Sequence, residues 1–339
     1  MDEDMTVVKA VMDKNGLHFE DPALIDKASR VKVSNSLITG MLKCPARQAA
    51  DKWILPDVLP VDPLSPAVLG SAFHKVMEIF YGYPPKERTL DAIKQAYRDM
   101  LKDDEFKAVN ESDEAKKWVR HRVKEYWNDR FEDPSKVRIA QVEKEGKYGK
   151  YLVSGLELYI QDNIGDSTRP TCGFIDRLSV DDNGDYIVDD WKTGKNAHVF
   201  NPKDKYPDFS LVRQQVIYTL ILENTTDRDV NTARLIYPDT KHVDDSGATV
   251  DGGLFVDTIP VHNKKYRDRA IRDVETVSRM LDDCNETNTW PAEPSPLCSW
   301  CPLVNICPNA KKIAKQNAVE AREAAPSRDM LAEGGIVAA

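Results

Sequence analysis

The sequence predicts an α/β protein, in which segments with helical and strand periodicity follow one another along 339 residues. Three observations predict this class. Apolar residues recur every three or four positions in PAVLGSAFHKVMEIFY (residues 66–81) and again in LVRQQVIYTLILEN (residues 211–224), while two short apolar runs between residues 174 and 190 flank a turn. A repeat of about 3.6 residues marks a helix face, and a repeat of two marks a strand face. A chain of this length can bury a large core in one elaborated domain or two.

The composition is that of a soluble globular protein, with 41% hydrophobic and 30% charged residues. No apolar run approaches the roughly 18 residues that cross a membrane. The acidic start MDEDM lacks the basic and then apolar layout of a signal peptide, so we expect a cytoplasmic protein. The formal charge of −9 argues against non-specific coating of nucleic acid but is compatible with a locally basic groove.

The N-terminal third is predicted to be mainly helical. Residues 1–30 show no sustained periodicity, so we expect an irregular arm there. The stretch Ser34-Asn35-Ser36 is an N-cap signal for a helix over LITGMLKCPARQAADKW (residues 37–53). This helix should stop or bend at Pro45 because proline cannot donate the next backbone hydrogen bond. Pro66 opens the next helix, and a further helical pattern over residues 90–131 ends at Asp133-Pro134.

The β part of the chain begins after that helical stretch. We expect strands at residues 137–142, 151–160, 174–180, 186–190, 232–237 and 254–261. We expect helices at 211–224, with Ser210 as the cap, and at 266–284. Residues 201–208 and 241–253 are rich in polar residues and are expected to be loops. The end of the chain, residues 313–339, lacks a periodic apolar face, so we expect a disordered tail.

The hairpin at residues 174–190 carries carboxylates where core residues belong. The turn signal DDNG (residues 181–184) separates its strands. Alternation places Asp190 and Lys192 on one face. With an odd number of loop residues, Asp176 lies opposite Asp190, with Cβ atoms about 5 Å apart. Two such carboxylates are costly to bury unless a cation neutralises them, and Lys192 alone leaves one negative charge over.

Both faces of this hairpin are apolar, which predicts that the two acids are buried in a sheet. Phe174, Leu178 and Val188 share one face, and Ile175, Ile187 and Trp191 share the other. Oxygen ligands with positions left for water suit Mg²⁺ or Mn²⁺ better than Zn²⁺. A lysine next to such a metal can orient a bound water or offset phosphate charge. The competing interpretation is a surface hairpin with a solvated Asp-Lys pair.

His74 and a helical Gln-Tyr pair gain meaning only from the hairpin. His74 lies at the margin of the apolar face of its helix, where a histidine is usually a packed, hydrogen-bonded residue. It becomes a candidate ligand because the acid pair needs more donors. Gln214 and Tyr218 are four residues apart and share a helix face. Glu143, at a strand end, is either a supporting acid of the metal site or a solvent-facing residue.

Four of the six cysteines form a second candidate site. The C-terminal run CSWCPLVNIC carries Cys298, Cys301 and Cys307, and Cys44 near the start can supply a fourth ligand. A reducing cytoplasm argues against disulfides. Four thiolates can hold either an iron–sulfur cluster or zinc, although zinc ribbons usually use paired C-x2-C knuckles. The other two, Cys172 and Cys284, are expected to be small buried hydrophobes.

Two stretches interleave basic and aromatic residues. KKWVRHRVKEYWNDR (residues 116–130) and NKKYRDRAIR (residues 263–272) are each either a DNA-contacting groove or an ordinary helix with a solvated face.

Taken together, the sequence resembles the RecB-type branch of the PD-(D/E)xK nuclease superfamily, in particular its iron–sulfur exonucleases, which occur in CRISPR-associated, AddB-like and phage-encoded forms. The similarity covers nearly all of residues 34–310. It rests on six stretches in the family's order, which are SNSLITGMLKCP, LGSAFHKVMEIFY, GFIDRL, IVDDWKTG, RQQVIYTL and CSWCPLVNIC. The resemblance implies a restriction-endonuclease-like core, a central mixed sheet flanked by helices, within residues 31–312. It also implies a helical insertion at about 86–131 and a four-cysteine cluster joining the N- and C-terminal segments.

The resemblance also implies roles for individual residues. His74, Asp176, Asp190 and the carbonyl of Trp191 would bind Mg²⁺ or Mn²⁺, and Lys192 would be the catalytic lysine. Gln214 and Tyr218 would lie near DNA, and Cys44, Cys298, Cys301 and Cys307 would hold a [4Fe–4S] cluster. Asp189 is a departure, because it doubles the acid beside Asp190, and strand parity with Lys192 selects Asp190.

The function implied is a metal-dependent DNA exonuclease acting on single strands or ends in recombination, repair or phage DNA processing, with DNA and recombination or repair proteins as partners. One alternative is an end-binding and trimming module of a larger recombination or CRISPR adaptation complex. A second is a cluster-bearing structural subunit with an inactive site. The chain has no G-x4-GK[ST] phosphate loop, so no helicase motif accompanies the nuclease pattern.

Overall fold

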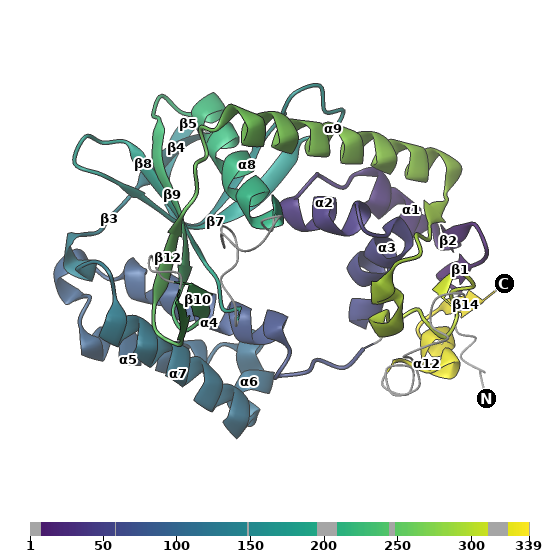
Figure 1. Ribbon diagram of the computed structural model, residues 1–339, viewed down its shortest axis with the longest axis horizontal. Helices are drawn as coiled ribbons and strands as arrows, with labels where there is room; N and C mark the ends of the chain where they lie inside the picture. Colours follow the sequence, from purple (N-terminus) through teal and green to yellow (C-terminus); the bar gives the residue numbers. More distant parts are fainter. Residues whose placement is uncertain are drawn as a thin grey trace. The chain divides into compact units, whose positions relative to one another are not determined.

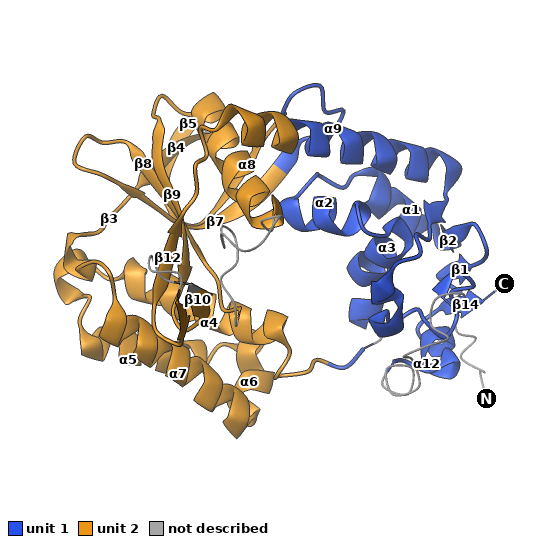
Figure 2. Ribbon diagram, viewed as in Figure 1, with its two compact units in different colours: residues 1–60, 163–171, 271–339 blue, residues 61–162, 172–270 orange. Residues whose placement is uncertain are grey.

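The computed structural model describes residues 8–57, 59–147, 149–194, 209–243, 248–310 and 325–338. The chain divides into two compact units, which we describe one at a time (Figure 2). Unit 1 comprises residues 1–60, 163–171 and 271–339, and unit 2 comprises residues 61–162 and 172–270. Helix α9 (Lys264–Thr287) runs through the division at residue 271.

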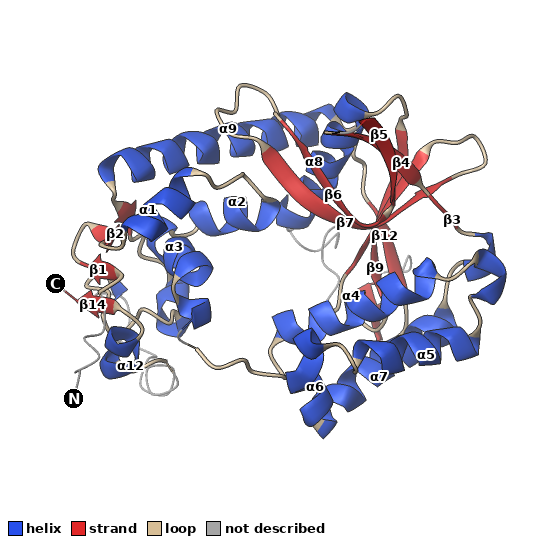
Figure 3. Cartoon of the chain, turned by 180° about the vertical axis from the view of Figure 1, so that it is seen from behind, coloured by secondary structure: helices blue, strands red, loops and turns tan. Residues whose placement is uncertain are grey.

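Unit 2 is built on a mixed sheet (Figure 3). Its strand order is β12-β9-β8-β7-β3, and β6 also pairs with β7. Strands β8 and β9 are parallel, whereas β7–β8, β9–β12 and β3–β7 are antiparallel. The strands are β3 (Arg138–Ile139), β6 (Leu156–Asp162), β7 (Thr171–Val180), β8 (Tyr186–Trp191), β9 (Val230–Tyr237) and β12 (Phe255–Thr258). The predicted central mixed sheet is therefore confirmed.

Two hairpins accompany this sheet. They pair β4 (Gln141–Gly146) with β5 (Gly149–Ser154), and β10 (Lys241–Val243) with β11 (Thr249–Asp251). The second hairpin falls in residues 241–253, for which the sequence predicts a polar loop. That prediction is wrong because strands of three residues are too short to show alternation. The predicted loop at 201–208 lies outside the described residues.

Helices α4 to α7 pack on one face of the sheet. They are α4 (Pro66–Gly82), α5 (Leu90–Met100), α6 (Lys107–Glu111) and α7 (Asp113–Asp129), with short 3₁₀ turns η2 (Pro85–Glu87), η3 (Asp104–Phe106) and η4 (Pro134–Lys136). Their apolar faces form one buried cluster with Trp191 of β8 and Ile236 of β9. The predicted helical stretch 90–131 is interrupted because Ser112 caps a new helix by accepting from the backbone N–H of Ala115.

Helix α8 (Phe209–Thr225) packs against β6, β8 and β9 (Figure 1). It contacts Lys192 at the end of β8, whereas the neighbouring Trp191 points into the cluster of α4 to α7. Successive strand residues point to opposite faces, so α8 and α4 serve different faces of the sheet. The predicted cap Ser210 is wrong, because the helix already begins at Phe209, which is buried against Tyr266 with ring centroids 6.1 Å apart.

Unit 1 contains a four-stranded sheet of order β13-β2-β1-β14. The strands are β1 (Ala10–Met12), β2 (Gly16–Phe19), β13 (Trp290–Pro291) and β14 (Ile336–Ala338). The helices are α1 (Pro22–Ser29), α2 (Asn35–Met41), α3 (Pro45–Trp53) and α12 (Arg328–Glu333), with turns η1 (Leu55–Asp57) and η5 (Pro296–Trp300). Phe19, Trp53 and Trp290 pack ring to ring, with centroids 5.2–5.8 Å apart. The predicted break at Pro45 is confirmed.

Both ends of the chain are more ordered than predicted. The expected irregular arm contains β1, β2 and α1, and the expected disordered tail contains α12 and β14. Strand β1 pairs with β14 in parallel, so the two segments stabilise each other. A strand of three residues that pairs with a partner at the other end of the chain has no periodicity of its own to reveal it. Residues 311–324 lie outside the described part of the tail.

Candidate metal centre and catalytic site

The β7–β8 hairpin brings Asp176 and Asp190 to one face of the sheet. Arg177 pairs with Asp189 and Val180 with Tyr186, with a five-residue connection from 181 to 185 between the strands. Continuing this register by one step would set Asp176 opposite Asp190, although the pairing itself ends at Arg177. Both carboxylates are buried, at 8% and 1% exposure. The prediction that both acids are buried in the sheet is therefore confirmed.

One part of the hairpin prediction is wrong. Phe174 was expected on a buried face, but it is 55% exposed, whereas Leu178 and Val188 are fully buried. The pairing of β7 with β8 runs only from Arg177 to Val180. Phe174 therefore lies past the paired part of the strand and has no β8 neighbour to cover it.

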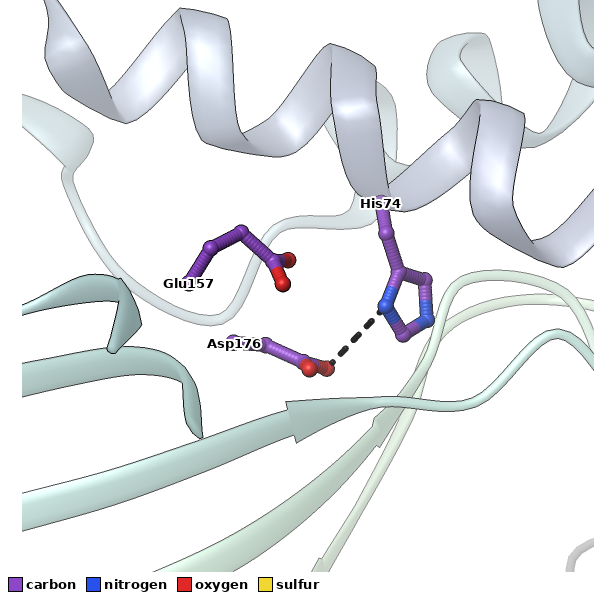
Figure 4. Close-up of side chains that lie close together, drawn as sticks. All are labelled: His74, Glu157 and Asp176. Carbon is purple, nitrogen blue, oxygen red and sulfur yellow. Dashed lines mark ion pairs between the residues drawn. The ribbon is translucent and has the colours of Figure 1, made fainter. Parts of the chain in front are cut away.

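His74 reaches this pair from helix α4. Ser65 caps the helix and Pro66 starts it, which fixes the register that aims His74 at the end of β8. Its Nε2 lies 2.9 Å from the carbonyl oxygen of Trp191, and its Nδ1 lies 3.4 Å from Oδ2 of Asp176 (Figure 4). The backbone N–H of Trp191 donates to the same Asp176 oxygen at 2.6 Å. The predicted ligands His74, Asp176 and the Trp191 carbonyl are thus neighbours.

Glu157 of β6 joins the group, and the sequence did not single it out. His74, Glu157 and Asp176 each offer one ligand atom, and these atoms lie within 4.8 Å of one another (Figure 4). In the sequence, Glu157 alternates with Leu156 and Leu158 in the strand LELYI, and this pattern is typical of a solvent-facing acid on a half-buried strand. Its φ of 46° is unusual for a residue other than glycine and is typical of a strained functional position.

The other acid considered for this site is not part of it. Glu143 is exposed and pairs with Lys150 of the neighbouring strand, with 2.5 Å between Oε1 and Nζ. Of its two interpretations, the solvent-facing residue is the correct one.

The cluster contains more buried negative charge than its cations offset, and the pKa values show this. Burial raises the pKa of Asp190 to about 6, although Lys192 opposes the shift. Burial, together with the charge of Asp176, raises the pKa of Glu157 to about 7. Burial alone would lower the pKa of His74, but the charge of Asp176 outweighs it and raises this pKa to about 9. Burial opposes ionisation of Asp176 too, yet His74 holds its pKa below the ordinary value.

The donor set fits a divalent cation. Oδ2 of Asp190 is buried, and its partner is the ammonium of Lys192, with Nζ 2.5 Å away. His74 and Lys192 supply two positive charges, whereas Asp176, Asp190 and Glu157 can supply three negative ones, so one carboxylate charge is left without a partner in the cluster. Two buried carboxylates, a third carboxylate and a backbone carbonyl are the hard oxygen ligands that Mg²⁺ and Mn²⁺ prefer.

Lys192 is held by a chain of side chains that leads to helix α8. Its Nζ donates to Oε1 of Gln214 at 3.0 Å, and Nε2 of Gln214 donates to the hydroxyl of Tyr218 at 2.9 Å. Tyr218 is 5% exposed. Its ring packs directly on the backbone of Gly173, because a Cβ at that glycine would lie only 2.4 Å from Cε1 of Tyr218. The structure therefore brings both predicted residues to the lysine, with Tyr218 behind Gln214.

Asp189 and Asp190 point to opposite faces of β8, which shows which of the two acids belongs to the cluster. Asp189 points away from the cluster and is fully buried. It forms ion pairs with two arginines: its Oδ2 lies 2.6 Å from Nη2 of Arg177, and its Oδ1 lies 2.6 Å from Nε of Arg234. Glu132 adds a second carboxylate to this ion network. Asp190 is left as the acid that faces Asp176 and Lys192, as strand parity predicted.

The ring of Trp191 is fixed on the same side as Asp189. It packs against Phe73, Tyr81 and Tyr126, with ring centroids 6.2, 6.2 and 5.3 Å away. Because the ring is 2% exposed and held on three sides, the carbonyl of Trp191 is held toward His74.

The four predicted cysteines meet in unit 1. Cys44 immediately precedes α3, and Cys298 lies in η5. Together with Cys301 and Cys307 they line a small cavity of about 20 Å³. All six cysteines are free thiols, and burial raises the pKa of Cys301 to about 12 and that of Cys307 above its usual range. Cys284 is buried as predicted, but Cys172 is only partly buried, and neither lines this cavity.

The two basic stretches are partly occupied by internal contacts. In α7, Arg122 pairs with Asp239, and Arg130 lies over the ring of Trp127 at 4.2 Å. In α9, Arg267 pairs with Glu223 at 2.6 Å. Other basic residues of α7 remain at the surface and line a groove of about 430 Å³ with α5, which includes Lys94, Tyr97, Arg98, Arg120, Lys124 and Trp127.

A mixed sheet whose hairpin sets two buried acids and a lysine beside a helical histidine is the arrangement expected of a metal-dependent nuclease. The chain belongs to the PD-(D/E)XK nuclease superfamily, whose family model matches residues 32–308. Its fold is therefore restriction-endonuclease-like. No curated protein matches the chain.

A solved structure described as "Crystal structure of SSO0001" is similar at 15% identity, covers 84% of this chain and 94% of that chain, and has a TM-score of 0.31. At that TM-score we draw nothing from the likeness. In the part of the chain that the structure describes, no helix is long and apolar enough to span a bilayer.

Proposed function

We propose that this protein is a Mg²⁺- or Mn²⁺-dependent deoxyribonuclease that removes nucleotides from single strands or DNA ends, in recombination, repair or phage DNA processing. The observation that carries the proposal is the cluster of His74, Glu157 and Asp176, whose ligand atoms lie within 4.8 Å of one another beside the buried Asp190. Family membership supports the nuclease class.

The cation would be held by oxygens of Asp176, Asp190 and Glu157 and by the carbonyl of Trp191, with His74 as the nitrogen donor. When bound, it would supply an activated water and offset charge on the attacked phosphate. The protons that now occupy His74 and Glu157 would leave as it binds, because ligands must be deprotonated.

Lys192 would act on the phosphate side of the site. Asp190 and Gln214 hold its Nζ in one place, so the ammonium does not have to be ordered when substrate arrives. From there it can orient the attacking water or donate to a phosphate oxygen. Gln214 and Tyr218 would contact substrate indirectly, by fixing the lysine.

The test is cleavage of end-labelled single- and double-stranded DNA in Mg²⁺, Mn²⁺ or EDTA. We expect metal-dependent release of nucleotides by the native protein and loss of at least about 10²-fold in rate for Asp176→Ala and Asp190→Ala. Lys192→Ala should still bind metal and fail in the chemical step. The matched control is Asp182→Ala, which removes a fully exposed acid from the turn of the same hairpin.

Near-native cleavage by Asp190→Ala would exclude the assigned centre. Metal-independent binding of DNA ends without any cleavage would favour the alternative, an end-binding and trimming module of a recombination or CRISPR adaptation complex.

We also propose that Cys44, Cys298, Cys301 and Cys307 hold a [4Fe–4S] cluster with a structural role, with zinc as the alternative. Convergence of the four thiols on one cavity supports a shared centre. The raised pKa values of Cys301 and Cys307 mean that without a metal these two thiols stay protonated and give no ionic stabilisation. Closing a loop of about 250 residues costs several kcal/mol of chain entropy, which a four-ligand centre would offset.

Protein purified without oxygen should be brown and contain iron and sulfide. The colour should be lost on replacement of any of the four cysteines and kept in Cys172→Ser and Cys284→Ser. A colourless protein that contains one zinc per chain would show that the four cysteines bind zinc and not an iron–sulfur cluster.

A further inference from the structure

An exposed aromatic pair lies beside the metal centre. Phe174 of β7 is 55% exposed, and its ring centroid is 5.1 Å from that of Tyr159 of β6, with the planes 52° apart. Phe174 is two residues from Asp176, and Tyr159 is two residues from Glu157. Phe174 and Tyr159 therefore lie on the two neighbouring strands that carry acids of the cluster, β7 with Asp176 and β6 with Glu157.

The ammonium of Lys144 packs against the Tyr159 ring of this pair. Nζ of Lys144 lies 5.7 Å from the centroid of the Tyr159 ring and donates to the carbonyl oxygen of the same residue. The Tyr159 hydroxyl donates to Gln161 at 2.9 Å. The tyrosine is thus held from two sides, which leaves Phe174 as the open ring of the pair.

A single exposed apolar residue needs no explanation in general. Phe174 differs by its position. Asp176 lies only two residues further along the same strand, and two strand residues span about 7 Å. A planar group lying on Phe174 would therefore belong to the nucleotide at the attacked phosphate or to its direct neighbour. Every base has a face that can stack on an aromatic ring, but in a duplex those faces are covered by neighbouring bases.

We propose that Phe174, backed by Tyr159, is a base-stacking subsite that holds an unpaired nucleobase next to the scissile phosphate. This rests on the proposed nuclease function and adds a reason for strand preference. A single strand or a frayed end offers a free base face to Phe174. A closed duplex must first unstack a base, so it binds the subsite less well.

The first experiment measures binding without chemistry. A fluorescently labelled oligothymidylate and a blunt duplex of the same length are titrated in EDTA against the native protein, Phe174→Ala and Phe174→Trp. Loss of one stacked base weakens binding by about 5- to 150-fold. We expect Phe174→Ala to lose that factor on the single strand and to lose under about twofold on the duplex, and Phe174→Trp to bind as the native protein does.

The matched control is Leu152→Ala, which removes a 65% exposed apolar side chain from hairpin strand β5. It should leave binding of both DNAs unchanged. Melting temperatures of both variants should match the native protein, since each side chain is mostly exposed already. Equal weakening by Leu152→Ala and Phe174→Ala would overturn the subsite, because it would reduce the effect to general surface apolarity.

The second experiment identifies the base. An oligonucleotide with one abasic position is moved along the single strand. When the abasic site is at the position that stacks on Phe174, the affinity of the native protein should fall by the same factor that Phe174→Ala causes on the intact strand. The affinity of Phe174→Ala itself should not fall further. Additive losses at every abasic position would contradict the proposal, as would binding of the intact strand by Phe174→Ala within twofold of native.

These measurements separate the two hypotheses. If the native protein cleaves no DNA but Phe174→Ala and the abasic strand show coupled losses, the nuclease function fails and the stacking subsite stands. If cleavage is normal and the coupling is absent, the nuclease stands and the subsite fails.

Discussion

Asp189 and Asp190 are adjacent in the chain and have opposite environments. Asp189 is neutralised by Arg177 and Arg234, and although burial opposes ionisation, Arg177 holds its pKa below the ordinary value. Asp190 faces Asp176 and has one lysine, so its pKa is raised to about 6 by burial. The same residue type is therefore structural at one position and a candidate ligand at the next.

Asp189→Asn should destabilise the protein without touching the metal face. It leaves the buried guanidinium of Arg177 without its main partner, which costs about 3–5 kcal/mol. Urea denaturation measures this loss, and metal affinity measured on the folded protein should be unchanged. Asp182→Asn, at an exposed position in the same hairpin, should change stability by less than about 1 kcal/mol. Comparable losses in both variants would contradict the assignment.

His74→Ala tests whether the histidine binds metal or only packs. Its side chain is 27% exposed and contacts Asp176 and the Trp191 carbonyl. We expect Mn²⁺ affinity, measured by calorimetry, to fall at least about tenfold with little change in melting temperature. The control is His121→Ala, at a side chain 54% exposed on α7. A variant that melts several degrees lower but binds Mn²⁺ normally would show a packing role.

At the scale of elements, the site depends on close contact between neighbouring strands. Gly155 lies between β5 and β6; its N–H donates to Ala140 and its carbonyl accepts from Leu178, which ties three segments together. A Cβ at Gly155 would lie 2.4 Å from the carbonyl oxygen of Leu178, which is backbone and cannot move aside. This contact fixes the start of β6, the strand that carries Glu157.

Gly155→Ala should therefore cost about 1–3 kcal/mol and weaken metal binding, because the β6–β7 contact must open. Gly82→Ala is the matched control, since a Cβ there meets nothing within 4 Å at the end of α4. It should be neutral or slightly stabilising. Denaturation curves and Mn²⁺ titration of both variants decide the matter; equal stability of the two would show that the strands adjust without cost.

Strand β12 contributes a pH dependence that is independent of the metal centre. Burial raises the pKa of Asp257 from 3.8 to about 6. The folded state thus binds this proton more tightly than the unfolded chain, and stability falls as the pH rises between these two values. The side chain is only partly buried, so we expect an effect on the order of 1 kcal/mol.

Asp257→Asn should remove that loss. Its melting temperature at pH 8 should exceed that of the native protein by about 2–4 °C, and the difference should vanish near pH 4, where the native aspartate is largely protonated in the fold. Melting curves across this range measure it. A constant difference at all pH values would mean that titration of Asp257 is not the cause.

At the scale of the molecule, each end of the chain is completed by the other. The N–H groups of Lys9 and Ala10 donate to the carbonyl of Gly335, and β1 pairs with β14. Leu331 and Ile336 are fully buried in the same unit. The predicted cysteine centre also joins segments from both ends, so unit 1 relies on contacts between residues distant in sequence.

Removal of residues 327–339 should loosen unit 1. Strand β1 loses its pairing with β14, and the buried side chains of Leu331 and Ile336 are removed from unit 1, which together costs about 2–5 kcal/mol of folding free energy. Amide exchange at residues 10–12 should become faster and the melting temperature should fall. Met330→Gln, at a 41% exposed position of α12, is the control. Unchanged exchange in the truncated protein would show that β1 does not depend on β14.

The sequence by itself determined the long elements and the hairpin centre. Periodicity located α4, α8 and α9, and the two-residue repeat selected Asp190 over Asp189 by its parity with Lys192. That Asp176 lies opposite Asp190 followed only for an odd-numbered loop, and the structure supplied the five-residue connection. These features depend on local geometry, which spacing along the chain fixes. The six ordered motifs then indicated the PD-(D/E)XK superfamily, which the comparison confirms, while its iron–sulfur exonuclease branch stays a prediction.

Only the tertiary structure placed Glu157 in the metal cluster, exposed Phe174 beside it and paired β1 with β14. Each depends on which strands pair and where that pairing ends. Glu157 occupies what looks like a solvent-facing position until β6 pairs with β7, and Phe174 looks buried until β8 proves too short to cover it. Contacts between distant segments leave no periodic signal in either segment, so only the packed chain decides them.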